Sequence, residues 1–238
     1  MSKNVFPLPL FCVKRWGIIT PKMSEKKAVP LQMLNQYTRN FKVLVVGDIL
    51  TGKQSFVKRY VNNIWHPLYK PTIGVDFALK TIQWAQNTTI RLQIWLIAGQ
   101  ERFSSMTRVY YKGADACVVL FDLERQTTLD GAIKWKKDLD SKYKLHSGKP
   151  VPCILVGNKS DLPDRPVDKE IIDKLCKEHS FLCWTEMSVK EDINVKKPME
   201  YLVKHLMEDG KEGSVPYKPV MDQKDPLENF PEEPDRFI

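Results

Sequence analysis

The chain of 238 residues predicts an α/β fold, with a six-stranded, mostly parallel sheet, one antiparallel hairpin strand and helices on both faces. Two observations predict it. Short apolar runs that suit buried strands alternate along the chain with stretches of helical spacing, and only one pair of successive strands is joined by a tight turn. Strands that alternate with helices form parallel sheets covered on both faces.

The first half of the chain supplies the hairpin. An apolar run at Phe41–Val46 predicts a buried strand, and a helix is expected to follow over Gly52–Val61. Phe77–Trp84 and Ile90–Leu96 alternate apolar and polar residues, with Gln86-Asn87 between them. This pattern predicts two antiparallel strands joined by a turn.

The second half supplies the remaining parallel strands. Ala116–Phe121 and Cys153–Val156 are continuous apolar runs, which are typical of buried parallel strands. Phe181–Thr185 is expected to form the last strand. Between the first two runs, mostly apolar residues recur at helical spacing from Leu129 to Tyr143.

Two prolines predict where the last two helices begin, because proline is favoured at the first helical position. Pro166 is expected to open a helix that carries Ile171 and Cys176. Pro198 is expected to open the last helix, which ends at Gly210.

Charge and proline content divide the chain into a domain over residues 41–208 and two flanking segments. Residues 1–40 carry a net charge of +6, and prolines interrupt their short apolar stretch, so we expect a flexible extension rather than a signal peptide. Residues 209–238 carry a net charge of −4 and five prolines, which predicts a disordered acidic tail. The domain also carries +6, but no run of five basic residues, so we expect no nucleic-acid binding.

Composition excludes several classes of protein. No stretch approaches 18 apolar residues, the length of a membrane-spanning helix. The five cysteines are irregularly spaced, which argues against a disulfide framework or a structural zinc site and favours a reducing compartment. We therefore expect a cytoplasmic protein.

A glycine-rich motif follows the first predicted strand. Residues 47–53 read GDILTGK and fit G-x-x-x-x-G-K, in which backbone N–H groups and the lysine hold phosphates. The alternative is a chance glycine-rich turn. The next position normally holds Ser or Thr as a Mg²⁺ ligand, but here it is Gln54. Ser55 lies about 100° further round the helix and should not substitute.

A second motif, N-K-x-D, follows the strand predicted at Cys153–Val156. Its carboxylate, Asp161, can accept two N–H bonds from guanine, while Asn158 fixes the loop and Lys159 covers the ring. The alternative is a polar turn. The motif is weak alone, but two motifs in this order, each at a strand end, reinforce one another.

With these motifs, residues 41–208 resemble the Ras superfamily and, within it, the Rab small GTPases, whose fold is that of the P-loop NTPases. Residues 71–77 look like switch I, and Trp95 with residues 98–103 (AGQERF) looks like the start of switch II. Residues 186–190 (EMSVK) resemble a third guanine-contact segment. Residues 76–80 and 106–108, with Ile97, look most like the branch serving lysosome-related organelles and trans-Golgi traffic.

The resemblance implies a site for GTP or GDP. Gln100 would be catalytic and orient the attacking water. Thr72 would bind both nucleotide and Mg²⁺. The full set of implied nucleotide-binding residues is Gly47, Asp48, Leu50, Thr51, Gly52, Lys53, Gln54, Ser55, Trp65, Tyr69, Thr72, Gly99, Asn158, Lys159, Asp161, Ser188, Val189 and Lys190.

Two departures from the family pattern affect the metal. Gln54 replaces the metal-binding hydroxyl, and Leu96 replaces the aspartate of D-x-x-G that holds the Mg²⁺ shell. An apolar side chain cannot ligate a metal. We therefore expect Mg²⁺ binding to be weak or absent and GTP hydrolysis to be impaired.

Two functions stay open. The first is a Rab-like switch in vesicle traffic with weak hydrolysis, and the alternative is a pseudo-GTPase scaffold that keeps the effector surface at Phe77, Trp95 and Tyr110. A P-loop metabolic kinase is disfavoured by the N-K-x-D motif. The last cysteine is Cys183, so no prenylation motif is present. We expect a monomer without a direct lipid anchor, recruited to Golgi or endolysosomal membranes by partners.

Overall fold

The computed structural model describes residues 37–67, 72–103 and 106–209. The chain divides into two compact units, residues 1–35 and 36–238. The first unit lies outside the described residues, as does the segment from residue 210 onward. The extension and the tail expected from the sequence therefore remain predictions.

The predicted α/β fold is confirmed. One six-stranded sheet has the order β2-β3-β1-β4-β5-β6, in which only the β2·β3 pair is antiparallel. The strands are β1 (Tyr37–Gly47), β2 (Val75–Ala85), β3 (Thr88–Ile97), β4 (Ala116–Asp122), β5 (Cys153–Asn158) and β6 (Cys183–Glu186).

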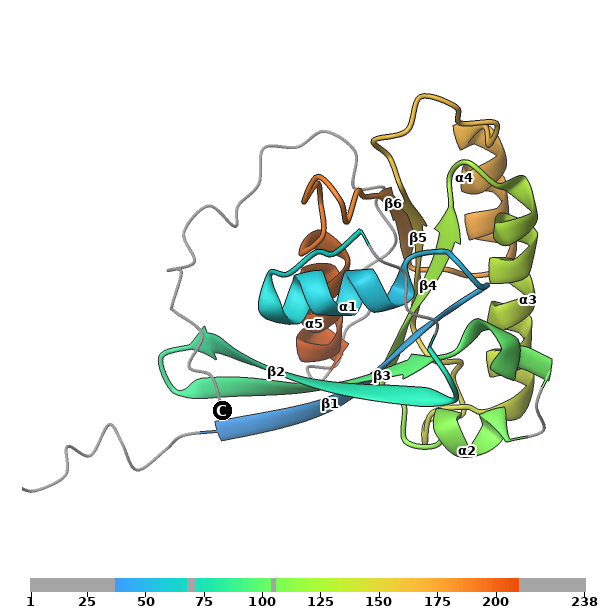
Figure 1. Cartoon of the computed structure of the whole chain (residues 1–238). Helices are drawn as coiled ribbons and strands as arrows, with labels where there is room; N and C mark the ends of the chain where they lie inside the picture. The colour runs from blue at the N-terminus through green and yellow to red at the C-terminus, as the bar shows by residue number, and fades with distance from the viewer. Residues whose placement is uncertain (1–36, 68–71, 104–105, 210–238) are drawn as a thin grey trace, which may run out of the picture. The chain divides into compact units, whose positions relative to one another are not determined.

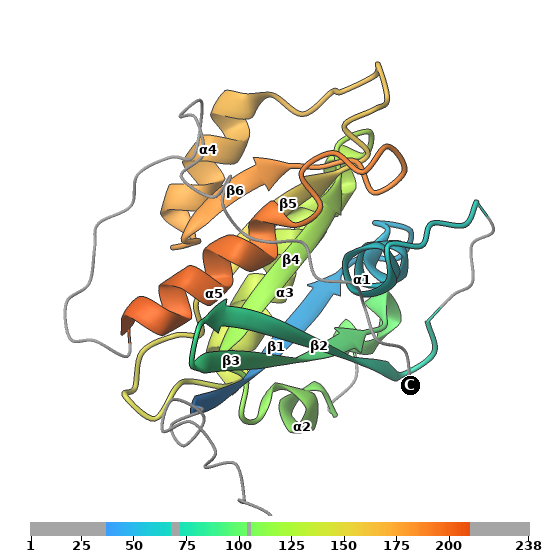
Figure 2. The same cartoon turned by 90° about the vertical axis from the view of Figure 1, so that its left-hand side faces the viewer.

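Helices cover both faces of the sheet (Figures 1 and 2). α1 and α5 pack on one face, where their apolar residues share a core with β1, β3 and β4. α2, α3 and α4 contribute to the core on the other face, where Tyr111 and Trp135 are fully buried. The helices are α1 (Lys53–Asn62), α2 (Thr107–Tyr111), α3 (Gln126–Lys142), α4 (Lys169–Glu178) and α5 (Lys197–Asp209), with a short 3-10 helix η2 (Gly99–Phe103).

Several element boundaries differ from the prediction by two residues or more. β1 begins at Tyr37, because its backbone N–H bonds the carbonyl of Asn87 at 2.8 Å and extends the sheet. α4 begins at Lys169 rather than Pro166, because the carboxylate of Asp168 caps it by accepting from the N–H of Glu170 at 3.0 Å. β6 begins at Cys183, two residues late.

The fold also adds two short elements that no pattern indicated. η2 and α2 each span only five residues, too few for a helical period to show. Both lie between β3 and β4.

The parallel strands place four loops at one edge of the sheet. β1, β4, β5 and β6 are mutually parallel, so the segments after their carboxyl ends lie together. In open α/β sheets, ligands bind beyond this edge. The two sequence motifs follow β1 and β5, and the fold therefore brings them to one place.

Candidate functional site

The glycine-rich loop is held closed by its own side chains. The hydroxyl of Thr51 donates to the carbonyl oxygen of Asp48 at 2.9 Å, and the ammonium of Lys53 donates to the same oxygen at 2.8 Å. Gly52 has φ 88°, in the left-handed region, and caps α1. The loop therefore leads directly into a helix N-terminus, where phosphates bind.

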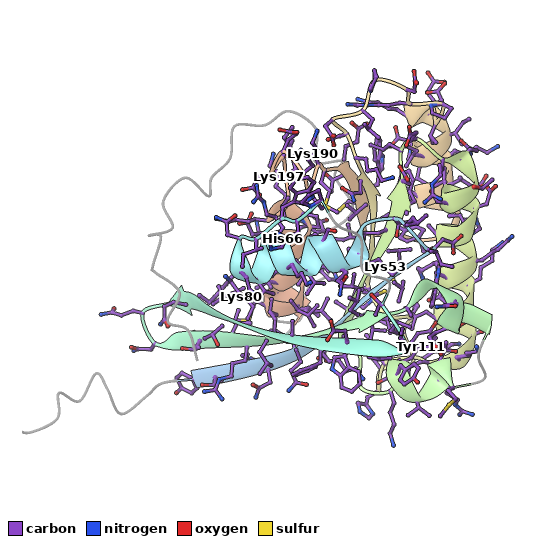
Figure 3. All side chains as sticks on the ribbon, in the orientation of Figure 1. Lys53, His66, Lys80, Tyr111, Lys190 and Lys197 are labelled. Atoms are coloured by element: carbon purple, nitrogen blue, oxygen red, sulfur yellow. The ribbon has the colours of Figure 1, made fainter. Side chains whose placement is uncertain are left out.

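Lys53 is a buried cation at the start of α1 (Figure 3). Its side chain is 6% exposed. Burial lowers the pKa of Lys53 from 10.5 to about 8, and the nearby charge of Asp48 only partly opposes this. A desolvated ammonium attracts an anionic ligand more strongly than an exposed ammonium does.

Asn158 connects the two motifs. Its side-chain Nδ2 donates to the carbonyl oxygen of Thr51 at 3.0 Å, and its Oδ1 accepts from the N–H of Val189 at 3.3 Å. The Asn158 side chain packs closely against the loop, since a Cβ on Gly52 would lie 2.2 Å from its Nδ2. One buried amide thus links the segments after β1, β5 and β6.

The carboxylate of Asp161 is fixed by the segment after β6. Its Oδ1 accepts from the Ser188 hydroxyl at 2.6 Å, and its Oδ2 lies 3.9 Å from the ammonium of Lys190. The N–H of Ser160 bonds the carbonyl of Met187 at 3.0 Å. The predicted base-contact residues therefore form one connected unit.

Lys159 pairs with a carboxylate that the sequence analysis missed. Its ammonium lies 2.6 Å from Oδ2 of Asp122, which is fully buried at the end of β4. Arg125 also pairs with Asp122 at 3.0 Å, and its Nη2 donates to the carbonyl oxygen of Ile49 at 3.0 Å. Asp122 therefore ties the base loop to the phosphate loop. One feature of the sequence indicates Asp122 as a site residue: it is an acidic residue at the end of an apolar run, at the edge of the sheet where ligands bind.

The segments that resemble the switches meet at one backbone bond. The N–H of Ala98 donates to the carbonyl of Gly74 at 2.9 Å. Gly99 packs so closely on the phosphate loop that a Cβ there would lie 2.6 Å from the N of Ile49. Gln100 follows in η2 with an exposed side chain.

Of three more expected residues, the structure describes two. Trp65 is partly buried and packs against the core beneath α1 and α5. Thr72 is partly buried just before β2. Tyr69 lies outside the described residues.

The two positions that depart from the family's metal-site pattern have different environments. Leu96 is 1% exposed and belongs to the core that also holds Val45 and Phe56. Gln54 and Ser55 are partly exposed on the first turn of α1. Within the described residues, no group of three or more His, Cys, Asp or Glu could hold a metal ion. An apolar side chain such as that of Leu96 cannot ligate a metal.

Two of the three aromatic residues expected at an effector surface contact one another. The rings of Phe77 and Trp95 meet edge to face, with centroids 5.8 Å apart and planes at 82°. The ammonium of Lys42 lies 3.8 Å from the centroid of Trp95. Phe77 is 49% exposed, whereas Tyr110 is partly buried against the α3 side of the core. Across the described residues, no helix is long and apolar enough to cross a membrane.

Comparison with known proteins gives concordant results. The Ras family profile matches residues 42–208. Ras-related protein Rab-7L1 of Rattus norvegicus is 52% identical over 172 residues, which cover 72% of this chain and 84% of the relative. Rab-32 of Homo sapiens is 48% identical over 168 residues, covering 70% and 75% of the two chains. Rab-32B of Dictyostelium discoideum is 46% identical over 182 residues, covering 76% and 70%.

Proposed function

Because the chain belongs to the Ras family and, within it, to the Rab small GTPases of the Rab-7L1 and Rab-32 branch, we propose that it is a guanine-nucleotide-binding switch in intracellular vesicle traffic whose GTP hydrolysis is weak. The observation that carries this proposal is the Asn158 amide, which joins the phosphate loop to the base loop. Partners would recruit the protein to Golgi or endolysosomal membranes.

Nucleotide binding is supported by groups that need no metal. Lys53 is a buried ammonium beside the phosphate loop, and α1 presents its N-terminus there. Asp161 is oriented by Ser188 and Lys190. These groups would supply phosphate charge compensation and guanine recognition respectively.

Weak hydrolysis is supported by the metal position. Leu96 is buried among apolar side chains and cannot hold a metal-bound water. A metal contributes several kcal/mol to phosphoryl transfer, and about 1.4 kcal/mol corresponds to a tenfold change in rate. Gln100 would still orient a water, but without the metal we expect turnover far below that of an intact member of the family.

A second candidate function is a pseudo-GTPase scaffold. It is favoured by Phe77, which is 49% exposed for partners and packs edge to face on the partly buried Trp95. It is also favoured by Lys159, whose ammonium is paired with Asp122. In this case the protein would present a Rab-like surface without nucleotide cycling.

One set of measurements tests both functions. Bound nucleotide is released from the purified full chain, and fluorescent GDP and GTP are titrated with Mg²⁺ and with EDTA. The switch with a defective metal site predicts saturable binding that EDTA leaves unchanged, and slow single-turnover cleavage. Binding that requires Mg²⁺, with cleavage at the rate of an intact Rab, would overturn it. The absence of any binding would favour the scaffold.

A further inference from the structure

A cationic groove lies away from the nucleotide site, between α2 and the carboxyl end of α3. Its volume is about 630 Å³. Figure 1 shows the two helices side by side, and Figure 3 labels Tyr111 in this region. Two of its lining residues are apolar, Val109 and Tyr143, and the other four are basic: Arg108, Lys112, Lys142 and Lys144. No acidic residue is among the lining residues.

Among the described residues, one of these cations, Lys142, forms an ion pair. The ammonium of Lys142 lies 2.7 Å from Asp138 and also donates to the hydroxyl of Thr107 at 2.7 Å. The other oxygen of Asp138 accepts from the hydroxyl of Tyr111 at 2.8 Å.

The remaining cations, Arg108, Lys112 and Lys144, form no ion pair with the residues that the structure describes, and all three side chains are exposed. They line the groove together with the apolar side chains of Val109 and Tyr143. The groove is therefore suited to an anionic peptide that also carries apolar side chains.

The chain contains such a peptide. Residues 222–238 hold six acidic and two basic residues, a net charge of −4. Leu227, Phe230 and Phe237 are interspersed among the acids, and three prolines restrict the backbone. Prolines lower the entropy lost when a segment is held extended.

We propose that residues 222–238 bind this groove in cis. Asp222 lies thirteen positions after the end of α5 at Asp209, and an extended chain of that length spans about 43 Å. A domain of this size is about 40 Å across, so the segment can reach the groove. Tethering gives it an effective concentration of about 1 mM. The bound segment would cover Arg108 and Val109, so a partner that uses α2 must displace it.

Hydrogen exchange of the full chain tests the contact. A tail-neutral variant carries Asp225→Asn, Glu228→Gln, Glu232→Gln, Glu233→Gln and Asp235→Asn. We expect amides of residues 107–112 and 143–145 to exchange several-fold faster in this variant than in the wild type. Raising the salt from about 0.05 M to about 0.5 M should have the same effect on the wild type, because exposed ion pairs are screened.

A fluorescent peptide of residues 222–238 identifies the binding surface. The peptide should bind the tail-neutral chain. It should bind the wild type more weakly, because there the chain's own tail occupies the groove. Adding Arg108→Gln, Lys112→Gln and Lys144→Gln should weaken peptide binding by roughly tenfold. The matched control removes three exposed charges elsewhere, Lys134→Gln, Lys177→Gln and Lys204→Gln, and should leave binding unchanged.

Three outcomes would overturn the proposal. Equal exchange of wild-type and tail-neutral chains would show that the tail does not cover the groove. Binding of the peptide that survives loss of the groove cations would place it elsewhere. If phosphatidylserine vesicles, and not the tail, slow exchange at these amides, the occupant is a membrane surface and the proposal is also wrong.

Discussion

The side-chain amide of Asn158 donates a 3.0 Å hydrogen bond to the carbonyl oxygen of Thr51, although the two residues lie 107 positions apart. Both are buried, Asn158 at 3% exposed and Thr51 at 0%. Removing one member of a buried hydrogen bond lowers the stability of the fold, because the other polar group is left without a partner. The bond therefore makes the phosphate loop and the base loop depend on one another.

Substituting Asn158→Ala should weaken both loops. The carbonyl of Thr51 and the N–H of Val189 would each lose a partner. We expect the free energy of unfolding to fall by about 1–3 kcal/mol, as measured by urea denaturation. Nucleotide affinity should fall as well. Asn87→Ala, in the exposed turn between β2 and β3, is the control and should change neither quantity. Equal losses in both variants would show that the bond from Asn158 to Thr51 does not hold the two loops together.

Gly52 gives a second test of the same contact. An alanine there would occupy φ 88° and place its Cβ 2.2 Å from Nδ2 of Asn158. The left-handed conformation alone costs about 1 kcal/mol, and the clash adds to it. The double variant Gly52→Ala/Asn158→Ala should therefore lose less stability than the sum of the single variants, because the second change removes the clash. Strict additivity in the denaturation cycle would argue that the two residues do not touch.

The pH dependence of nucleotide affinity should report on Lys53. Its pKa is lowered to about 8 by burial, and a bound phosphate would raise it again. Below about pH 8 the free lysine is already charged, so affinity is complete there. Above it, affinity measured in EDTA should fall by up to tenfold per pH unit. Lys53→Met should weaken binding at about pH 7 and abolish the slope, whereas a flat wild-type profile would refute this role.

The sequence predicted the fold well because the core is simple. Each buried strand appears as an apolar run, and β4 is buried at all seven of its residues. The position of the ligand-binding edge could also be predicted, because parallel strands place Gly47 and Asn158 at the same end of the sheet.

The missed features depend on tertiary contacts instead. Asp122 is buried only because Lys159 and Arg125 neutralise it, and no local pattern encodes those partners. α4 starts late because the side chain of Asp168 caps it better than Pro166 could.

Asp122→Asn tests whether this carboxylate organises the site. The substitution removes the charge that Lys159 and Arg125 share. Since both cations are about one third exposed and can turn to water, we expect a loss of about 1–3 kcal/mol, less than for a fully buried pair. Asp130→Asn, exposed on α3, is the control. No measurable change in the urea midpoint of Asp122→Asn would show that the pairs contribute nothing.

Restoring the metal ligands is the strongest test of the proposed function. Gln54→Ser with Leu96→Asp supplies a hydroxyl and a carboxylate where the family pattern expects them. An unpaired carboxylate in place of Leu96, which is 1% exposed, should destabilise the free protein by about 3–5 kcal/mol. Mg²⁺ with GTP should recover much of that loss, because a ligand that binds only the folded state stabilises it. The double variant should therefore show a Mg²⁺-dependent rise in Tm that the wild type lacks.

A matched substitution separates metal binding from general rescue by nucleotide. Leu92→Asp places the same carboxylate on the same face of β3, four residues earlier and equally buried. It should destabilise the chain similarly but gain nothing from Mg²⁺, since it lies four residues from the position that the family pattern assigns to the metal. If both variants respond to Mg²⁺ alike, or if wild-type Tm with GTP already depends on Mg²⁺, the wild-type site binds the metal after all. In that case Leu96 would not be what limits hydrolysis.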